Sequence, residues 1–371
     1  MDQKTLQRLE EFENSKQFYD ALQFYRTKVT RSFRLKNALE LSNPLVKHAV
    51  DFFLREKQYQ CAIDIITLYA ESLEKNGVEL DDVAMDLIAE TSAKLVEVIE
   101  DDDNEFSEAD ESLLVASRRK FVEISIQWSK SKSKTEQEQE CGSYQLHYLF
   151  AKKYAEKSSV ELAKNHYLLA ENPQEFSDFL LEVTKNSIEI EVDLLIAQIV
   201  LQLLCIDRFP YAKQVFEEFT RKIGAKTGEK QGFDLPLLNF INILFDVVAK
   251  VDVTQYAVIV ETYVSEIERD ETFKGYLSRI GKIYFGIRDQ VPMAGGLAGM
   301  LSGLMGGGMA AEKEETAKSH LNSSPPQKIA KFSVPASVAQ ARAKNAASAI
   351  KAATSSASKK PATAPVDDDL D

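Results

Sequence analysis

The sequence has 371 residues, of which 44% are hydrophobic and 28% are charged, and its formal net charge at pH 7 is −13. This is the profile of a soluble globular protein with ample residues for a core. The negative charge disfavours binding to DNA or to anionic membranes over most of the surface, so an electrostatically attracted partner should be basic, at least locally.

Cysteine usage and the start of the chain point to the cytosol. Cys61, Cys141 and Cys205 are odd in number and far apart, which favours a reducing compartment. The charged start, MDQKTLQRLEEFE, lacks the apolar region of a signal peptide. Residues 235–248 are shorter than the roughly 20 apolar residues that cross a bilayer. Because residues 293–311 hold seven glycines, no stable membrane insertion is expected there either.

Hydrophobic spacing predicts helices along nearly all of the chain from residue 4 to about residue 288. An apolar stripe with steps of three and four residues runs through 18–29. Asn43 and Pro44 have the order of an N-cap followed by a first-turn proline, which predicts a helix start at this point. Further helices are expected over 59–75 and 83–99.

The middle of the chain alternates helix signals with polar links. Ser107 and Asp110 have the spacing of a capping box and begin a predicted helix. That helix is expected to end where the polar sequence SKSKSKTEQEQE, residues 129–140, begins a loop. Asn172 and Pro173 repeat the order of cap and proline and predict another helix start.

The last predicted helices flank one irregular segment. Residues 192–206 are apolar almost all round, as in a helix that is covered on several sides. Residues 223–234, IGAKTGEKQGFD, contain three glycines and no helical period, and they are predicted to form a loop or a small β-hairpin. Helices expected at 253–267 and 273–285 complete the folded part.

Together these elements predict an all-α fold. Strand patterns are scarce, and the helices follow one another as antiparallel pairs. Such pairs suggest an α-solenoid of divergent, TPR-like repeats, which bury a face only by stacking on their neighbours. Small residues beside aromatic ones, at Ala21, Ala62 and Ala212, suit the close approach of two helices. No strict repeat period is detectable, so a non-repeating helical bundle is the alternative.

The chain is predicted to have four parts. Residues 1–156 and 157–290 form the N-terminal and C-terminal halves of the solenoid. Residues 291–309 place Leu and Met at helical spacing among glycines, a pattern that suits either a cap on the solenoid or a helix that enters a partner's groove. Residues 310–371 have too few apolar side chains to offset the entropy of ordering, which predicts a disordered tail.

Signals of catalysis are missing from the sequence. The four histidines do not have zinc-site spacing, and the sequence contains neither a phosphate-binding GxxxxGK[ST] loop nor a GxSxG elbow. His147 and His166 lie on apolar helix faces, as hydrogen-bonded histidines between helices do. We therefore expect a protein that is not an enzyme and that holds no metal or cofactor.

Two segments suggest contacts with other proteins. Arg26, Lys28, Arg31, Arg34 and Lys36 form a basic patch that is too small for nucleic acid but suits an acidic protein surface. Ordinary exposed cations on helix faces are the alternative explanation of this patch.

The second segment is the apolar helix expected over residues 235–248. Asn239, Asn242 and Asp246 form one narrow polar stripe, and apolar residues cover the rest. Such a helix needs neighbours on more than one side. Either the solenoid supplies them all, or one flank docks a second protein together with the preceding loop.

The order and spacing of six stretches resemble one known family. They are FYDALQFYRT (18–27), AESLEKNGVELDD (70–82), LLIAQIVLQLLC (194–205), LPLLNFI (235–241), YLSRIGKIYFG (276–286) and GGLAGMLSGLMGG (295–307). The sequence resembles the Golgi-to-ER traffic protein 4 family, a subunit of the transmembrane-domain recognition complex. Residues 35–50 depart from the family pattern, and the tail beyond about residue 310 has no counterpart in it.

The resemblance implies a non-enzymatic cytosolic α-solenoid scaffold that serves the targeting of tail-anchored membrane proteins to the endoplasmic reticulum. In this family the N-terminal half engages the targeting ATPase. The C-terminal half holds a ubiquitin-like-domain protein that recruits an upstream chaperone, and in animal members a BAG-type holdase joins the complex. The alternative belongs to another class of function: the chain would be a structural solenoid subunit of a different multisubunit complex.

The resemblance also assigns candidate contact residues. For the ATPase they are Lys4, Tyr19, Arg26, Asp64 and Glu71. Asp64 and Glu71 lie seven residues apart and so project from one helix face, although solvated acidic positions would have the same spacing. For the ubiquitin-like partner they lie within 223–248 and are Phe233, Leu235, Leu237, Leu238, Ile241 and Phe245.

Overall fold

The computed structural model describes residues 3–101, 104, 106–185, 192–227 and 235–287. The chain divides into two compact units, Met1–Gly307 and Gly308–Asp371, and all described residues belong to the first. Within these ranges the structure contains sixteen helices and no strand, which confirms the all-α prediction. The segments predicted as an amphipathic helix (291–309) and as a disordered tail (310–371) lie outside the described residues.

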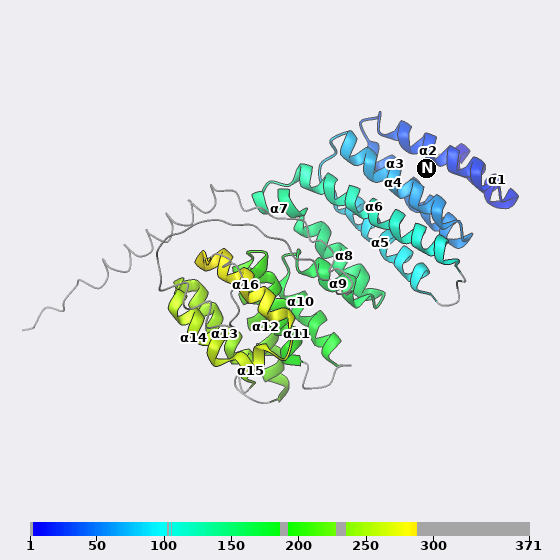
Figure 1. Cartoon of the computed structure of the whole chain (residues 1–371). Coiled ribbons are helices and arrows are strands. Elements are labelled where there is room, and N and C mark those ends of the chain that lie inside the picture. The colour runs from blue at the N-terminus through cyan, green and yellow to red at the C-terminus, as the bar shows by residue number, and fades with distance from the viewer. Residues whose placement is uncertain (1–2, 102–103, 105, 186–191, 228–234, 288–371) are drawn as a thin grey trace, which may run out of the picture. The chain divides into compact units, whose positions relative to one another are not determined.

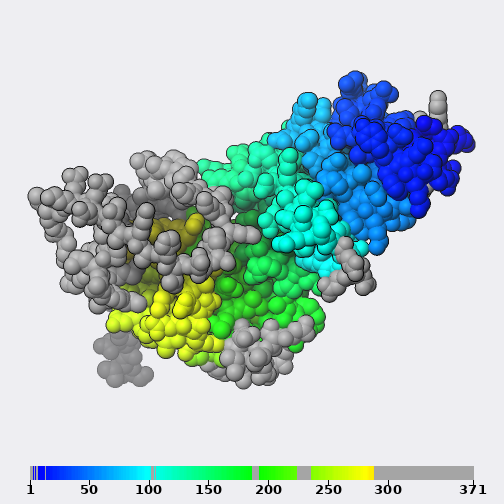
Figure 2. Space-filling model, turned by 45° about the vertical axis from the view of Figure 1, so that its right-hand side comes forward, coloured from blue at the N-terminus to red at the C-terminus, as the bar shows by residue number. Residues whose placement is uncertain are grey.

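The N-terminal half consists of helices stacked in two layers (Figure 1). One layer contains α2, α4 and α6 in succession, and the other contains α3, α5 and α8, while α3 also packs on α4 and α5 on α6. The first helices form one continuous surface, from dark blue to cyan in Figure 2. The bounds are α1 Gln3–Ser15, α2 Phe18–Ser32, α3 Ala38–Arg55, α4 Tyr59–Lys75, α5 Asp82–Glu100, α6 Glu108–Lys132, α7 Glu136–Cys141, α8 Tyr144–Glu156 and α9 Val160–Tyr167.

The C-terminal half continues the helical packing around α11. This helix contacts α12, α13 and α16, while α10 packs on α12 and α13 on α14. The bounds are α10 Pro173–Thr184, α11 Val192–Cys205, α12 Phe209–Thr227, α13 Pro236–Lys250, α14 Val253–Thr262, α15 Val264–Ile267 and α16 Thr272–Phe285. The predicted α-solenoid of antiparallel helix pairs is confirmed.

Small residues allow the helices to approach closely, as predicted. Ala21, Ala62 and Ala212 are completely buried. Aromatic side chains fill the space between layers, and the indole Nε1–H of the fully buried Trp128 donates a hydrogen bond of 2.9 Å to the carbonyl oxygen of Val78. The bond satisfies the polar atom that a buried Trp carries.

Three local predictions are wrong. Helix α3 begins at Ala38 and contains Pro44 in its interior; the side chain of Asn43 accepts a hydrogen bond from the Tyr69 hydroxyl and does not cap a helix. The predicted polar loop 129–140 is largely helical, since α6 extends to Lys132 and α7 covers Glu136–Cys141. Helix α12 extends to Thr227, so the first part of the predicted loop or hairpin 223–234 is helical, while 228–234 lie outside the described residues.

Other capping predictions are correct. The Asn172 side chain accepts a hydrogen bond of 3.1 Å from the backbone N–H of Glu175, and Pro173 occupies the first turn of α10. The Ser107 hydroxyl accepts one of 3.1 Å from the backbone N–H of Asp110 at the start of α6. Among the described helices, none is both long and apolar enough to cross a bilayer.

Candidate functional site

The N-terminal surface consists of Tyr19 and Arg26 on α2 and of Asp64 and Glu71 on α4. Helices α2 and α4 are neighbours in one layer, so the solenoid brings these two pairs of side chains onto adjacent helices. Tyr19 is 72% exposed, Glu71 is exposed, and Arg26 and Asp64 are partly exposed. The side chain of Lys4 lies outside the described residues.

Few contacts within the chain involve this N-terminal surface. The Asp64 carboxylate accepts one hydrogen bond of 3.1 Å, from the Gln60 side chain one turn earlier. Across the described part of the chain, no hydrogen bond or ion pair joins the α2 pair to the α4 pair. The exposed Tyr19 ring and the unpaired charges of both signs on these two helices are available to a partner with complementary charges.

Most of the apolar residues that were predicted as C-terminal anchors are buried in this structure. Leu237, Leu238, Ile241 and Phe245 are at most 2% exposed. Their helix, α13, packs against α11, α14 and α15. The Phe245 ring also lies 5.7 Å from the Phe209 ring and 5.6 Å from the Phe216 ring, both on α12. The chain thus supplies the neighbours of these four side chains, which leaves little of their surface for direct contact with a partner.

Leu235 is different, because 43% of its side chain is exposed immediately before α13. The polar stripe predicted for α13 is present. Asn242 and Asp246 in it are exposed, and the partly buried Asn239 side chain donates a hydrogen bond of 2.7 Å to the Tyr263 hydroxyl. Phe233 falls in 228–234, outside the described residues, so its assignment stays a prediction.

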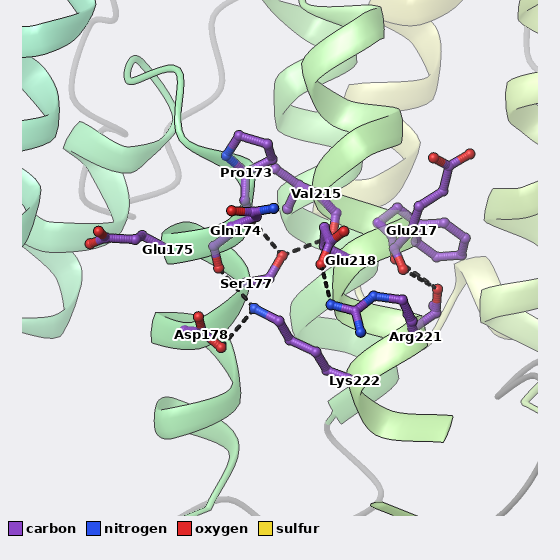
Figure 3. Close-up of polar contacts among 12 residues, drawn as sticks. Pro173, Gln174, Glu175, Ser177, Asp178, Val215, Glu217, Glu218, Arg221 and Lys222 are labelled. Carbon is purple, nitrogen blue, oxygen red and sulfur yellow. Dashed lines mark hydrogen bonds and ion pairs between the residues drawn. The ribbon is translucent and has the colours of Figure 1, made fainter. Parts of the chain in front are cut away.

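Polar contacts between α10 and α12 fix the end of α12, just before the segment 228–234 (Figure 3). The Lys222 ammonium lies 2.7 Å from the Asp178 carboxylate and donates a hydrogen bond of 3.0 Å to the Gln174 carbonyl oxygen. The Ser177 hydroxyl lies between the two helices and reaches the Val215 carbonyl oxygen at 3.2 Å. No local pattern predicts this cluster, because its members lie about 40 residues apart and form no motif.

His147 on α8 and His166 on α9 form a hydrogen bond with each other, as predicted for histidines between helices. Their Nδ1 atoms are 2.9 Å apart. Because a carbonyl oxygen only accepts, His147 Nε2–H donates to the Cys141 carbonyl oxygen at 3.0 Å. In the neutral ring His147 Nδ1 is then the acceptor, and His166 Nδ1–H donates to it.

The surroundings of this pair keep both rings neutral. Burial lowers the pKa of His147 to about 4, and burial also lowers the pKa of His166 well below its usual value. The nearby charges oppose protonation as well, since Arg208 lies near His147 and Arg118 near His166. The pair is therefore a structural contact between α8 and α9.

The cysteines show no sign of nucleophilic activation. Burial raises the pKa of the thiol in Cys61, Cys141 and Cys205, in the last case to about 12. In the described ranges, no group of three or more His, Cys, Asp or Glu side chains is arranged to hold a metal ion. The absence of an enzymatic activity stays a prediction.

Comparison with known proteins identifies relatives over most of the chain. A family model described as "Golgi to ER traffic protein 4" matches residues 36–305. The "Golgi to ER traffic protein 4 homolog" of Bos taurus is 32% identical over 292 residues, which cover 78% of this chain and 83% of the relative. The homolog of Homo sapiens is 30% identical over 311 residues, which cover 83% of this chain and 87% of the relative.

A solved structure with a related name is also similar to this chain. It is described as "Crystal structure of C. therm. Get4" and shares 20% sequence identity with this chain. The match covers 80% of this chain and 100% of the other, with a TM-score of 0.44.

Proposed function

Because this chain belongs to the Golgi to ER traffic protein 4 family, we propose that it is a non-enzymatic cytosolic adaptor in the targeting of tail-anchored membrane proteins to the endoplasmic reticulum. The adaptor bridges a targeting ATPase and a ubiquitin-like-domain protein that recruits a chaperone. A BAG-type holdase is a further partner where the organism has one. The family model matches residues 36–305, which lie in both halves of the solenoid.

The ATPase binds the N-terminal surface in this proposal. The exposure of Tyr19 and Glu71 and the scarcity of internal contacts at Asp64 support this assignment. These side chains pack little against the solenoid, so their binding role does not compete with the stability of the fold. The single observation that carries the proposal is that these residues belong to the neighbouring helices α2 and α4 and have exposed or partly exposed side chains.

The ubiquitin-like protein binds near the start of α13. Leu235 supplies an exposed apolar side chain, and Phe233 is the second proposed anchor. The ion pair between Lys222 and Asp178 joins the C-terminal part of α12 to α10, a few residues before the end of α12. This arrangement confines the proposed contact to residues that precede the buried face of α13.

Charge reversal tests the assignment of the ATPase surface. The purified Asp64→Lys/Glu71→Lys variant should bind the ATPase at least about tenfold more weakly, because two attractive charge pairs become repulsive. The affinity is measured by titration of a fluorescently labelled ATPase. The matched control is Glu123→Lys/Glu261→Lys, which reverses two exposed carboxylates outside the first turns of their helices, on α6 and α14.

The control should keep the affinity of the unmodified chain, and both variants should keep its helix content and unfolding midpoint. Equal affinity of all three proteins for the ATPase would remove Asp64 and Glu71 from the interface. If both variants lost the same amount of affinity for the ATPase, the loss would result from the change in the net charge of the chain and not from the positions of Asp64 and Glu71.

A further inference from the structure

The turn between α2 and α3 carries positive charge that the described part of the chain does not neutralise. Residues 26–39 contain five Lys or Arg residues and no Asp or Glu, and one exposed acid, Glu40, follows them, in a chain whose net charge is −13. Arg31, Arg34 and Lys36 are exposed, and within the described ranges their side chains form no ion pair or hydrogen bond.

Several cations elsewhere in the solenoid are paired with acids on another helix. Lys94 lies 2.8 Å from the Asp51 carboxylate, and Lys157 lies 2.6 Å from that of Glu97. These pairs join α3 to α5 and α5 to the end of α8. The cations of the α2–α3 turn join no helices, so a structural role in packing does not account for them.

The same turn exposes apolar side chains. All four residues of 34–37 are exposed, and the side chain of Leu35, which lies between Arg34 and Lys36, is 55% exposed. Leu41, in the first turns of α3, is 39% exposed. These apolar side chains lie beside the cations of the turn, so a partner that covers the turn buries apolar surface and neutralises charge at one place.

The turn is held firmly at its base. The Phe33 ring lies 6.0 Å from the Tyr69 ring of α4. The backbone N–H of Leu35 donates to the Ser32 carbonyl oxygen at 3.0 Å, and that of Arg34 donates to the Arg31 carbonyl oxygen at 3.1 Å. These contacts fix the backbone, so little entropy is lost when the exposed side chains meet a partner.

We propose that this basic turn, residues 31–41, binds the surface of an anionic phospholipid bilayer. Lipid phosphates neutralise Arg31, Arg34 and Lys36, while Leu35 inserts below the level of the headgroups. An acidic protein surface would also satisfy the cations, but it would need an apolar recess matched to Leu35. A bilayer offers apolar depth at every position, and so it fits the alternation of cation and leucine better.

The negative charge of the remaining surface limits this contact to the turn. It therefore makes the binding reversible and gives the chain one orientation at the membrane. The contact lies beyond the proposed adaptor function, because it requires neither the ATPase nor the ubiquitin-like protein. It would deliver the N-terminal surface to the bilayer that receives tail-anchored substrates.

Vesicle flotation of the purified full-length chain tests the proposal. The vesicles contain phosphatidylcholine alone, or phosphatidylcholine with about a third of phosphatidylserine. The chain should float with the anionic vesicles and not with the neutral ones. Because each cation near an anionic surface strengthens binding roughly fivefold, Arg34→Glu/Lys36→Glu should weaken it by more than about tenfold. Leu35→Asn should weaken it about fivefold, since it removes the inserted side chain.

The matched control is Arg119→Glu/Lys120→Glu, which reverses two exposed cations on α6 and should leave flotation unchanged. Recovery of the unmodified chain only with neutral vesicles, or with none, overturns the proposal. So does an equal loss of flotation in the control. If the turn variant binds vesicles normally but loses the ATPase, the basic turn is a protein contact and not a lipid contact.

Discussion

Helix α13 and the N-terminal surface differ in what their side chains contact. The apolar face of α13 packs against α11, α12 and α14, and Phe245 is buried between aromatic rings of the chain itself. On α2 the Tyr19 ring is 72% exposed, and on α4 the Glu71 carboxylate is exposed. The apolar residues of α13 therefore hold helices together, whereas the exposed side chains of Tyr19 and Glu71 contribute little to packing.

Truncation in α13 should have the largest effect on stability. Phe245→Ala removes a buried ring, and we expect the free energy of unfolding to fall by about 3–5 kcal/mol. Urea denaturation followed by circular dichroism measures the change. The control Asp246→Ala alters an exposed neighbour and should shift the free energy by less than about 0.5 kcal/mol.

An unchanged unfolding midpoint in Phe245→Ala would break the comparison. It would mean that the Phe245 side chain is not part of the core. Loss of the ubiquitin-like partner without loss of stability would restore Phe245 as a direct anchor.

Acid should lower the free energy of unfolding through the buried His147, by less than the Phe245→Ala substitution does. The folded chain lowers the pKa of His147 from 6.5 to about 4. Because the folded-state pKa is depressed, the contribution of the neutral ring to stability is complete above about pH 6.5, is lost progressively as the pH falls below that value, and is fully lost near pH 4. A shift of this size corresponds to roughly 3 kcal/mol in the free energy of unfolding.

Urea midpoints between about pH 7.5 and 4 measure this loss. The His147→Asn variant supplies the comparison, since it retains every carboxylate but lacks this titrating ring. The difference in stability between the two proteins should shrink as the pH falls. A constant difference across the range would show that His147 is already protonated or is accessible to water in the folded state.

Substitution on the N-terminal surface should have the smallest effect on stability. Tyr19→Ala removes a ring that is 72% exposed, so the free energy of unfolding should change by less than about 0.5 kcal/mol. The affinity for the ATPase should nevertheless fall by about tenfold or more, as for an aromatic side chain at the centre of an interface. A large loss of stability together with full binding would reverse the roles of the two regions.

Two identical dipeptides show how far local sequence patterns predict this fold. Asn172 and Pro173 begin α10 as the pattern predicts, because the Asn172 side chain is free to cap the backbone. Asn43 and Pro44 have the same order but lie inside α3, where the Tyr69 hydroxyl of another helix engages Asn43. The dipeptide is the same in both cases, but α3 is already helical from Ala38, so the local pattern alone does not predict the helix start.

The candidate site shows the same limit. Apolar periodicity correctly predicts that α13 is a helix with one polar stripe, but it does not distinguish cover by the chain from cover by a partner. Leu235 and Leu238 look alike in the sequence, and only packing makes the first 43% exposed and the second buried. Contacts such as that of Lys222 with Asp178 join residues far apart in sequence, so no local pattern predicts them.

The most direct test of the adaptor is a three-component pull-down. The tagged ubiquitin-like partner is mixed with the ATPase, with or without the full-length chain, and the recovered ATPase is quantified. We expect recovery only when the chain is present. Recovery should fall with Asp64→Lys/Glu71→Lys, which should retain the ubiquitin-like protein, and with Leu235→Ser, which should retain the ATPase. Recovery of the ATPase without the chain, or a chain that binds only one partner at a time, would contradict the adaptor function.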